Sequence, residues 1–212
     1  MRRAADGTGD PEFLVESASA HLLNYPNWSR DGRFVLYNEL SPETLRDIRY
    51  IELRADGAVG EPVMFLGTPV REELPNLSPD GRFLAYASDE SERYEVYVRS
   101  FPGGDGKWQA SVNGGTLPRW RSDGRELYYV EGDTLMAVSV STEPTFALGQ
   151  PQPLFESPDP NPADALRQYD VSADGQRFLT IALAEADGDE ISRPTIRVVE
   201  NWYEEFRDRE QD

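Results

Sequence analysis

The sequence predicts an all-β fold organised as a β-propeller, and three observations lead to that prediction. The chain has 212 residues, of which 38% are hydrophobic, enough to bury one large core or a series of small stacked ones. An Asp-Gly turn between two apolar runs occurs four times, at intervals of 49, 43 and 51 residues. Such periods, built from short alternating strands, are typical of propeller blades. A helical solenoid would need long segments of 3.6-residue periodicity, for which the Gly and Pro spacing leaves no room.

The four turns are the most regular part of the pattern. Their sequences are YPNWSRDGRFVLY, LPNLSPDGRFLAY, LPRWRSDGRELYY and QYDVSADGQRFLT. Aspartate in such a turn accepts hydrogen bonds from nearby backbone N–H groups, and glycine takes the positive φ that the tight hairpin needs. Because the pair recurs in every repeat, we interpret it as structural. The predicted turn residues are Asp31, Gly32, Asp80, Gly81, Asp123, Gly124, Asp174 and Gly175.

Each repeat divides into a short strand before the turn, a second strand directly after it, and further strands rich in β-branched and aromatic residues. We therefore expect four blades of four-stranded antiparallel sheet, although the fourth repeat shows no obvious fourth strand. The expected blades span about 25–66, 74–113, 117–157 and 168–203.

The position just before each turn carries a large apolar residue, which we expect in the core between blades. These residues are Trp28, Leu77, Trp120 and Val171.

The ends of the chain have separate roles in this scheme. We expect a flexible segment at 1–11, a propeller over 12–206 and a charged tail at 207–212. Segment 12–17 (EFLVES) resembles an outer strand, which either closes the ring on the last repeat or belongs to a preceding blade. Because larger rings are commoner than four blades, we favour part of a larger ring. The open faces would then require self-association or further blades.

The pattern P-x-W-S-x-D-G-R followed by an apolar strand resembles the WD40-like propeller repeat of the TolB type. The stretch from DESERYEVYVRSF to GDTLMAVSV, with the later TIRVVENWYEEF, is still more similar to propellers behind bacterial serine/threonine protein kinases. The resemblance implies a non-catalytic binding or sensing scaffold, in a kinase sensor or a TolB-like envelope protein, and hence an extracytoplasmic setting. The alternative is a regulatory propeller of a peptidase or hydrolase whose catalytic domain is absent.

Residues for catalysis are scarce, so we expect no enzyme activity, metal or cofactor. His21 is the single histidine, no Gly-x-Ser-x-Gly elbow occurs, and there is no cysteine. The acidic run 185–192 lacks the ligand spacing of an EF-hand and is interpreted as a solvated loop. A propeller glycosidase or lyase using carboxylates of the central funnel remains a rival interpretation.

The net charge of −18 with a single lysine argues against nucleic acid as a partner, and no window is long and apolar enough for a membrane span. In an up-and-down blade, the first-to-second and third-to-fourth connections form one face, here called the turn face. The second-to-third and inter-blade connections form the other, the loop face. The loop-face segments sum to −12 and the turn-face segments to −2.

We therefore predict that a protein or small cationic ligand binds the loop face through Glu72, Glu73, Glu90 and Glu131. A merely solubilising acidic rim is the competing explanation.

Overall fold

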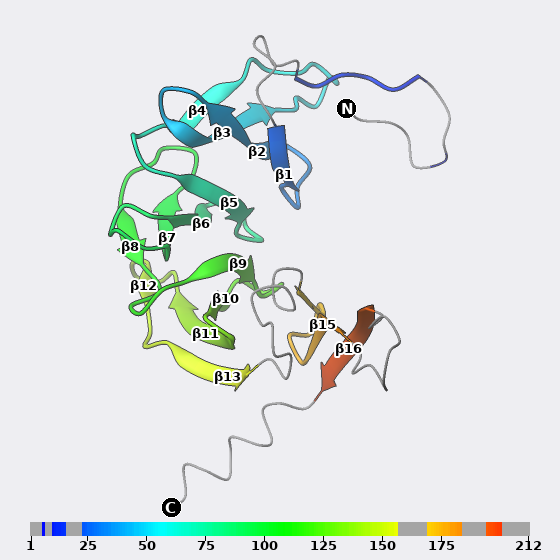
Figure 1. Ribbon diagram of the computed structural model, residues 1–212. Helices are drawn as coiled ribbons and strands as arrows, with labels where there is room; N and C mark the ends of the chain where they lie inside the picture. The colour runs from blue at the N-terminus through cyan, green and yellow to red at the C-terminus, as the bar shows by residue number, and fades with distance from the viewer. Residues whose placement is uncertain (1–5, 7–9, 16–22, 157–168, 184–193, 201–212) are drawn as a thin grey trace, which may run out of the picture.

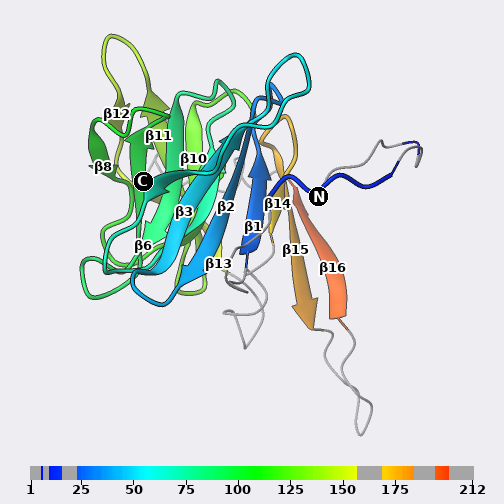
Figure 2. The ribbon, with the colours of Figure 1, turned by 90° about the horizontal axis from the view of Figure 1, so that it is seen from above.

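The computed structural model describes residues 6, 10–15, 23–156, 169–183 and 194–200, and these residues form strands and connecting loops without a helix. Four antiparallel sheets stand side by side in an open arc, with the first strand of each of the first three sheets on the concave side (Figure 1). Seen from above, the strands of the successive sheets run roughly along one direction (Figure 2). The prediction of an all-β propeller fold is confirmed.

The strands of the first two sheets follow one another in chain order. The first sheet consists of β1 (Leu23–Trp28), β2 (Phe34–Ser41), β3 (Leu45–Glu52) and β4 (Val63–Leu66). The second sheet consists of β5 (Glu72–Leu77), β6 (Phe83–Ser88), β7 (Glu95–Ser100) and β8 (Lys107–Gln109).

The third and fourth sheets depart slightly from this plan. The third consists of β9 (Thr116–Trp120), β10 (Glu126–Glu131), β11 (Thr134–Ser141), β12 (Ala147–Leu148) and β13 (Gln152–Glu156). Both β12 and β13 pair with β11, so the outer edge of β11 is shared by two short strands. The fourth sheet consists of β14 (Asp170–Val171), β15 (Arg177–Leu183) and β16 (Pro194–Glu200), three strands among the described residues.

The core lies between the sheets rather than within one central cluster. One apolar cluster joins the first and second sheets, with Leu36 and Tyr86 among its buried members. A second joins the second and third sheets around Trp120, and a third joins the third and fourth sheets around Phe178. Each sheet is therefore stabilised by burying apolar side chains against its neighbour.

Trp28 departs from the expectation that all four residues before the turns are buried. Leu77 and Trp120 are 8% and 7% exposed and Val171 is half-buried, but Trp28 is 57% exposed. Trp120 packs in the cluster that the third sheet shares with the second sheet, which precedes it in the arc. Among the described residues no sheet precedes the first one, so Trp28 has no such neighbour. The Trp28 indole instead donates a hydrogen bond of 3.0 Å to the Gly32 carbonyl of its own turn. The repeat motif specifies the position, but the neighbouring sheet decides the burial.

The N-terminal segment covers another part of the first sheet. Leu14 and Val15 pack against a cluster that contains Tyr37, Ile51 and Leu53. Segment 12–17, expected as an outer strand, is described only as far as Val15, where it forms no named strand.

Candidate functional site

The four Asp-Gly turns have the same geometry, which makes their corners equivalent. The inner-strand residue before each turn pairs with the residue seven positions later on the second strand. In every turn the glycine N–H donates to the carbonyl three residues earlier, at 2.8–2.9 Å, and the glycine φ lies between 71° and 76°. The aspartate Oδ1 accepts the backbone N–H two residues later, at 3.0–3.1 Å. These carboxylates therefore hold the hairpins in place.

The hydrogen bonds to three of the turn carboxylates, Asp31, Asp80 and Asp174, also lower their pKa. A hydroxyl bond from Ser29 lowers the pKa of Asp31, and Ser172 does the same for Asp174. Burial acts to raise the pKa of Asp80, but bonds from Ser78 and the Arg82 backbone and side chain outweigh it. A carboxylate held ionised by its own turn is a poor proton donor or acceptor for chemistry near neutral pH.

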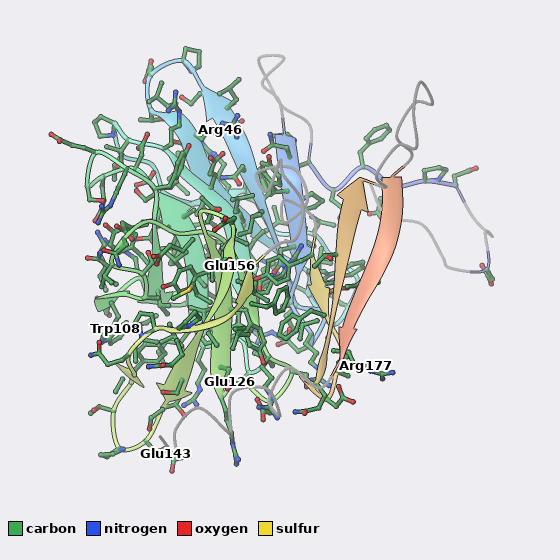
Figure 3. The ribbon with its side chains drawn as sticks, turned by 60° about the horizontal axis from the view of Figure 1, so that its bottom comes forward. Arg46, Trp108, Glu126, Glu143, Glu156 and Arg177 are labelled. Atoms are coloured by element: carbon green, nitrogen blue, oxygen red, sulfur yellow. The ribbon has the colours of Figure 1, made fainter. Side chains whose placement is uncertain are left out.

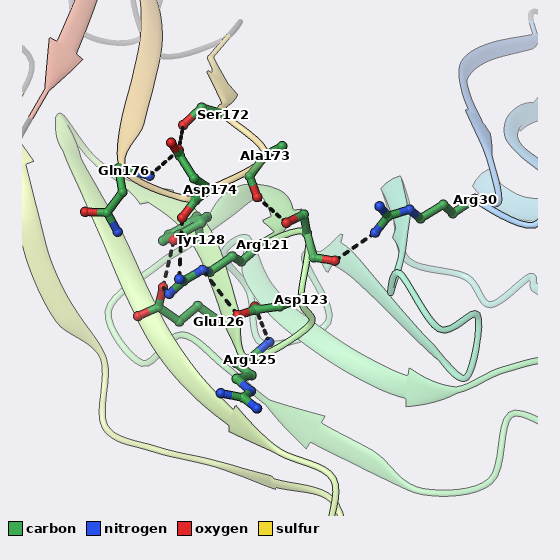
Figure 4. A network of polar contacts seen from close by, with 11 residues as sticks. Arg30, Arg121, Asp123, Arg125, Glu126, Tyr128, Ser172, Ala173, Asp174 and Gln176 are labelled. Atoms are coloured by element: carbon green, nitrogen blue, oxygen red, sulfur yellow. Dashed lines mark hydrogen bonds and ion pairs between the residues drawn. The ribbon is translucent and has the colours of Figure 1, made fainter.

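The turns also contact one another across the turn face (Figure 4). Arg30 of the first turn donates a 2.9 Å hydrogen bond to the Ser122 carbonyl of the third turn. The Ser122 hydroxyl donates to the Ala173 carbonyl of the fourth turn, and Arg121 donates to the Asp174 carbonyl at 3.4 Å. Three of the four turns are thus linked on this side of the arc.

The structure does not bring the four predicted loop-face glutamates together as one exposed patch. Glu72 is 3% exposed and accepts hydrogen bonds from the Thr68 hydroxyl and N–H. Burial raises the pKa of Glu72, although those bonds oppose the shift. Glu73 is 9% exposed and forms an ion pair with Arg46. Because both carboxylates are occupied inside the protein, neither is available as a free surface charge.

The other two predicted glutamates are nearer the surface. Glu90 is exposed and forms an ion pair with Lys107, the single lysine of the chain. Glu131 is half-buried, and its Oε2 has no hydrogen-bond partner among the described atoms. The exposed acidic residues of the loop face that have no described ion pair include Glu43, Glu92 and Asp133, together with Glu156 at the end of β13. Figure 3 shows Arg46 near the loop-face end of the sheets and Glu126 near the turn-face end.

Sequence reasoning did not identify Glu95, the most deeply buried carboxylate among the described residues. It is 0% exposed, and its Oε1 accepts hydrogen bonds from Arg93 Nε at 2.6 Å and from Gly114 N at 3.0 Å, while Oε2 accepts from Ser111. The Glu95 side chain thus ties β7 to the connection leading into the third sheet. The only signal in the sequence is an acidic residue at the start of an otherwise apolar strand.

The concave side of the arc contains a small cavity of about 160 Å³ lined by the inner strands β1, β5 and β9. Three matching tripeptides contribute to it: Tyr25-Pro26-Asn27, Leu74-Pro75-Asn76 and Leu117-Pro118-Arg119.

The first residue of each tripeptide has a positive φ, of 51°, 60° and 56°. Each accompanies a bulge in the pairing with the following strand, where proline removes no ladder hydrogen bond. Non-glycine residues rarely adopt this conformation, which costs about 1–3 kcal/mol. Its occurrence at all three positions therefore shows that the bulge is a regular structural feature of these inner strands.

The bulges direct asparagine side chains toward the next sheet. Asn27 Oδ1 accepts the Leu77 N–H at 3.2 Å, and Asn76 Oδ1 accepts the Trp120 N–H at 3.2 Å. The same position in the third sheet is Arg119, which is exposed and has no described side-chain hydrogen bond or ion pair. The cavity is therefore bounded by apolar side chains, two amides and one guanidinium.

Two further features of the described part of the chain concern metal-ligating side chains and long apolar helices. That part contains no group of three or more His, Asp or Glu residues placed to hold a metal ion. It also contains no apolar helix of membrane-spanning length. His21 and the acidic run 185–192 lie outside the described residues.

Comparison with solved structures identifies the fold. The structure matches TolB from Acinetobacter baumannii with a TM-score of 0.63 and 16% identity, covering 93% of this chain and 44% of TolB. The chain has a partial β-propeller fold, similar to part of the TolB structure. It also matches an oligogalacturonate lyase in complex with manganese, with a TM-score of 0.62 and 15% identity, covering 91% of this chain and 54% of the lyase.

The propeller domain of the Trilobed protease from Pyrococcus furiosus matches with a TM-score of 0.51 and 15% identity, covering 85% of this chain and 55% of that one. Neither a family model nor a curated protein sequence matches the chain. The chain spans about half the length of these solved structures, and at such identities the likeness shows the fold alone.

Proposed function

We propose that this chain is a non-catalytic binding or sensing module whose partner approaches from the loop face and reaches the cavity between the inner strands. The observation that carries the proposal is the combination of donors and apolar walls in that cavity. Its polar side chains, Asn27, Asn76 and Arg119, bind and orient rather than exchange protons at neutral pH. The contacts from Arg30 and Ser122 link the turns on the opposite side, which supports entry from the loop face.

The loop face would supply attraction for a basic partner. Glu43, Glu92 and Asp133 are exposed without a described ion pair, in a chain of net charge −18. Exposed charges of one sign accelerate association with an oppositely charged partner and are screened by salt. The partner proposed from the sequence, a protein or small ligand with positive charge, is retained here with these three residues in place of the buried Glu72 and Glu73.

The biological setting belongs to the same proposal. A TolB-like envelope protein outside the cytoplasm is supported by the structural likeness to TolB. A kinase sensor is supported by the sequence resemblance of the repeats.

A regulatory propeller of a peptidase is the second candidate, supported by the likeness to the propeller domain of the Trilobed protease. Detecting an α/β domain with a nucleophile elbow in the full gene product would favour it.

The proposal is tested by fluorescence anisotropy with a labelled basic peptide, acetyl-KKGKKG-amide, and an acidic peptide of equal length. We expect binding of the basic peptide alone, weakening with added salt, and no peptide consumed when the mixture is followed by liquid chromatography. Binding should weaken in the triple variant Glu43→Gln, Glu92→Gln, Asp133→Asn. It should persist in a matched turn-face variant, Glu61→Gln, Asp105→Asn, Glu143→Gln. Equal effects of the two triple variants, or turnover of the peptide, would contradict the proposal.

A further inference from the structure

The inner-strand cavity offers hydrogen-bond donors at three equivalent positions, and the fold itself fixes two of them. An asparagine amide has one oxygen that accepts and one nitrogen that donates. In Asn27 and Asn76 the oxygen is occupied by the backbone N–H of the next sheet. Nδ2 is then the part of each amide left for a ligand, and no described group accepts a hydrogen bond from either nitrogen. The two amides therefore present donors rather than acceptors.

Arg119 adds a positive charge at the third equivalent position. A guanidinium carries five donors and no acceptor. Arg119 is exposed and has no described ion pair, although the chain has 39 acidic residues to 21 basic ones. Asp170 occupies the matching position of the fourth sheet, where its Oδ1 accepts the Val171 N–H at 2.9 Å. The cation facing this cavity is thus not neutralised by the described carboxylates.

The remaining walls of the cavity are apolar. Leu74, Pro75, Leu117 and Pro118 line it together with the ring of Tyr25. Pro75 and Pro118 are buried, whereas Tyr25 is exposed, so one wall is open to solvent. A ligand that fits has a small anionic group next to an apolar one.

We propose that this cavity binds a free carboxylate attached to an apolar residue, as found at the C-terminus of a peptide. Arg119 forms an ion pair with the carboxylate, because a guanidinium can donate two parallel hydrogen bonds to it. Nδ2 of Asn27 and Nδ2 of Asn76 donate further hydrogen bonds to the carboxylate oxygens. The proline and leucine side chains contact the last side chain of the peptide.

The charges favour a carboxylate over a phosphate. One guanidinium balances one negative charge, and a phosphate dianion would bring a second charge into a strongly acidic protein. The inference rests on the proposed function, because the acidic loop face would attract basic residues that precede the C-terminus of the same peptide.

The test compares two labelled peptides that differ only at the C-terminus, acetyl-KKGGL as the free acid and as the amide. Isothermal titration of the unmodified chain should show the free acid binding roughly tenfold or more tightly, since a charge-assisted hydrogen bond is lost in the amide. Equal affinity of the two peptides would overturn the inference while leaving the binding function intact. If neither peptide binds, the proposed function fails as well.

Variants of two cavity residues locate the site. Arg119→Gln should weaken the free acid roughly tenfold or more and leave the amide unchanged, whereas Arg54→Gln removes an exposed arginine elsewhere and should change neither. Asn76→Asp keeps the oxygen that accepts the Trp120 N–H but replaces the donor by a negative oxygen. Its melting temperature should stay close to that of the unmodified chain while binding of the free acid is lost.

Two outcomes would contradict this assignment. In one, Arg119→Gln and Arg54→Gln change the affinity for the free acid equally, which would mean that the peptide senses only the overall charge of the protein. In the other, inorganic phosphate displaces the free-acid peptide more effectively than acetate does at equal concentration, which would assign the site to phosphate instead.

Discussion

Truncating Trp120 to alanine should cost about 4 kcal/mol of folding free energy, whereas the same change at Trp28 should cost about 2 kcal/mol or less. The two tryptophans occupy the same position of the repeat, before the Asp-Gly turn, but Trp120 is 7% exposed and Trp28 is 57% exposed. A buried tryptophan removes about 200 Å² from water, worth about 5 kcal/mol at roughly 25 cal/mol per Å². Trp28 buries less than half of its surface, so less than half of this free energy is at stake.

Hydrogen bonding adds to the difference. The Trp120 indole donates to the Asn76 carbonyl of the second sheet at 2.9 Å, and its loss leaves that acceptor without this partner. The bond from Trp28 to Gly32 is exposed and stays within one turn, where water can replace it.

The assay is urea unfolding followed by far-UV circular dichroism, because this signal comes mainly from the backbone of the strands, whereas fluorescence would come from the tryptophan that is removed. Both variants should unfold with a similar dependence on urea, and the Trp120 variant at the lower midpoint. Equal losses for the two variants would refute the reasoning, since they would mean that Trp28 is covered in solution as fully as Trp120.

Three further changes test other parts of the structure. Glu95→Ala should cost about 3–5 kcal/mol, because it leaves buried donors unpaired, and Glu95→Gln should cost less in the same urea assay. Gly81→Ala should cost about 1 kcal/mol in melting experiments through its φ of 73° alone, because no atom lies within 4 Å of the added Cβ. The folded pKa of Asp31, Asp80 and Asp174 lies below the ordinary value of 3.8, so their stabilising effect is present above that value and lost as the pH falls through the lowered one. Replacing all three by asparagine should therefore flatten the decline of the urea midpoint between roughly pH 5 and 2, and an unchanged decline would count against this assignment.

The repeat explains why so much of the fold could be predicted from the sequence. Asp-Gly recurs at each corner because its geometry depends on a few adjacent residues, such as Ser78, Asp80 and Gly81. Strand alternation then follows from residues close in sequence. Both signals are local, and the structure reproduces them in successive sheets.

The candidate site was less predictable because its properties depend on residues far apart in sequence. Glu72 and Glu73 follow a Pro-Val-Arg loop and carry charge, which indicates exposure, but Thr68 and the distant Arg46 bind them inside the protein. The cavity likewise combines three tripeptides separated by more than forty residues. The repeated Pro after a bulky residue was visible in the sequence, but its positive φ was not.

The division of the apolar core into separate clusters between the sheets affects how the molecule comes apart. Each sheet depends on its immediate neighbours, so opening should begin at the ends of the arc and move inward. Amide protons of β6, β7 and β10 would then exchange with deuterium most slowly, and those of β1 and β14 fastest. In such a protein an end sheet can unfold while the hydrogen bond between Asn76 of β5 and the Trp120 N–H remains formed.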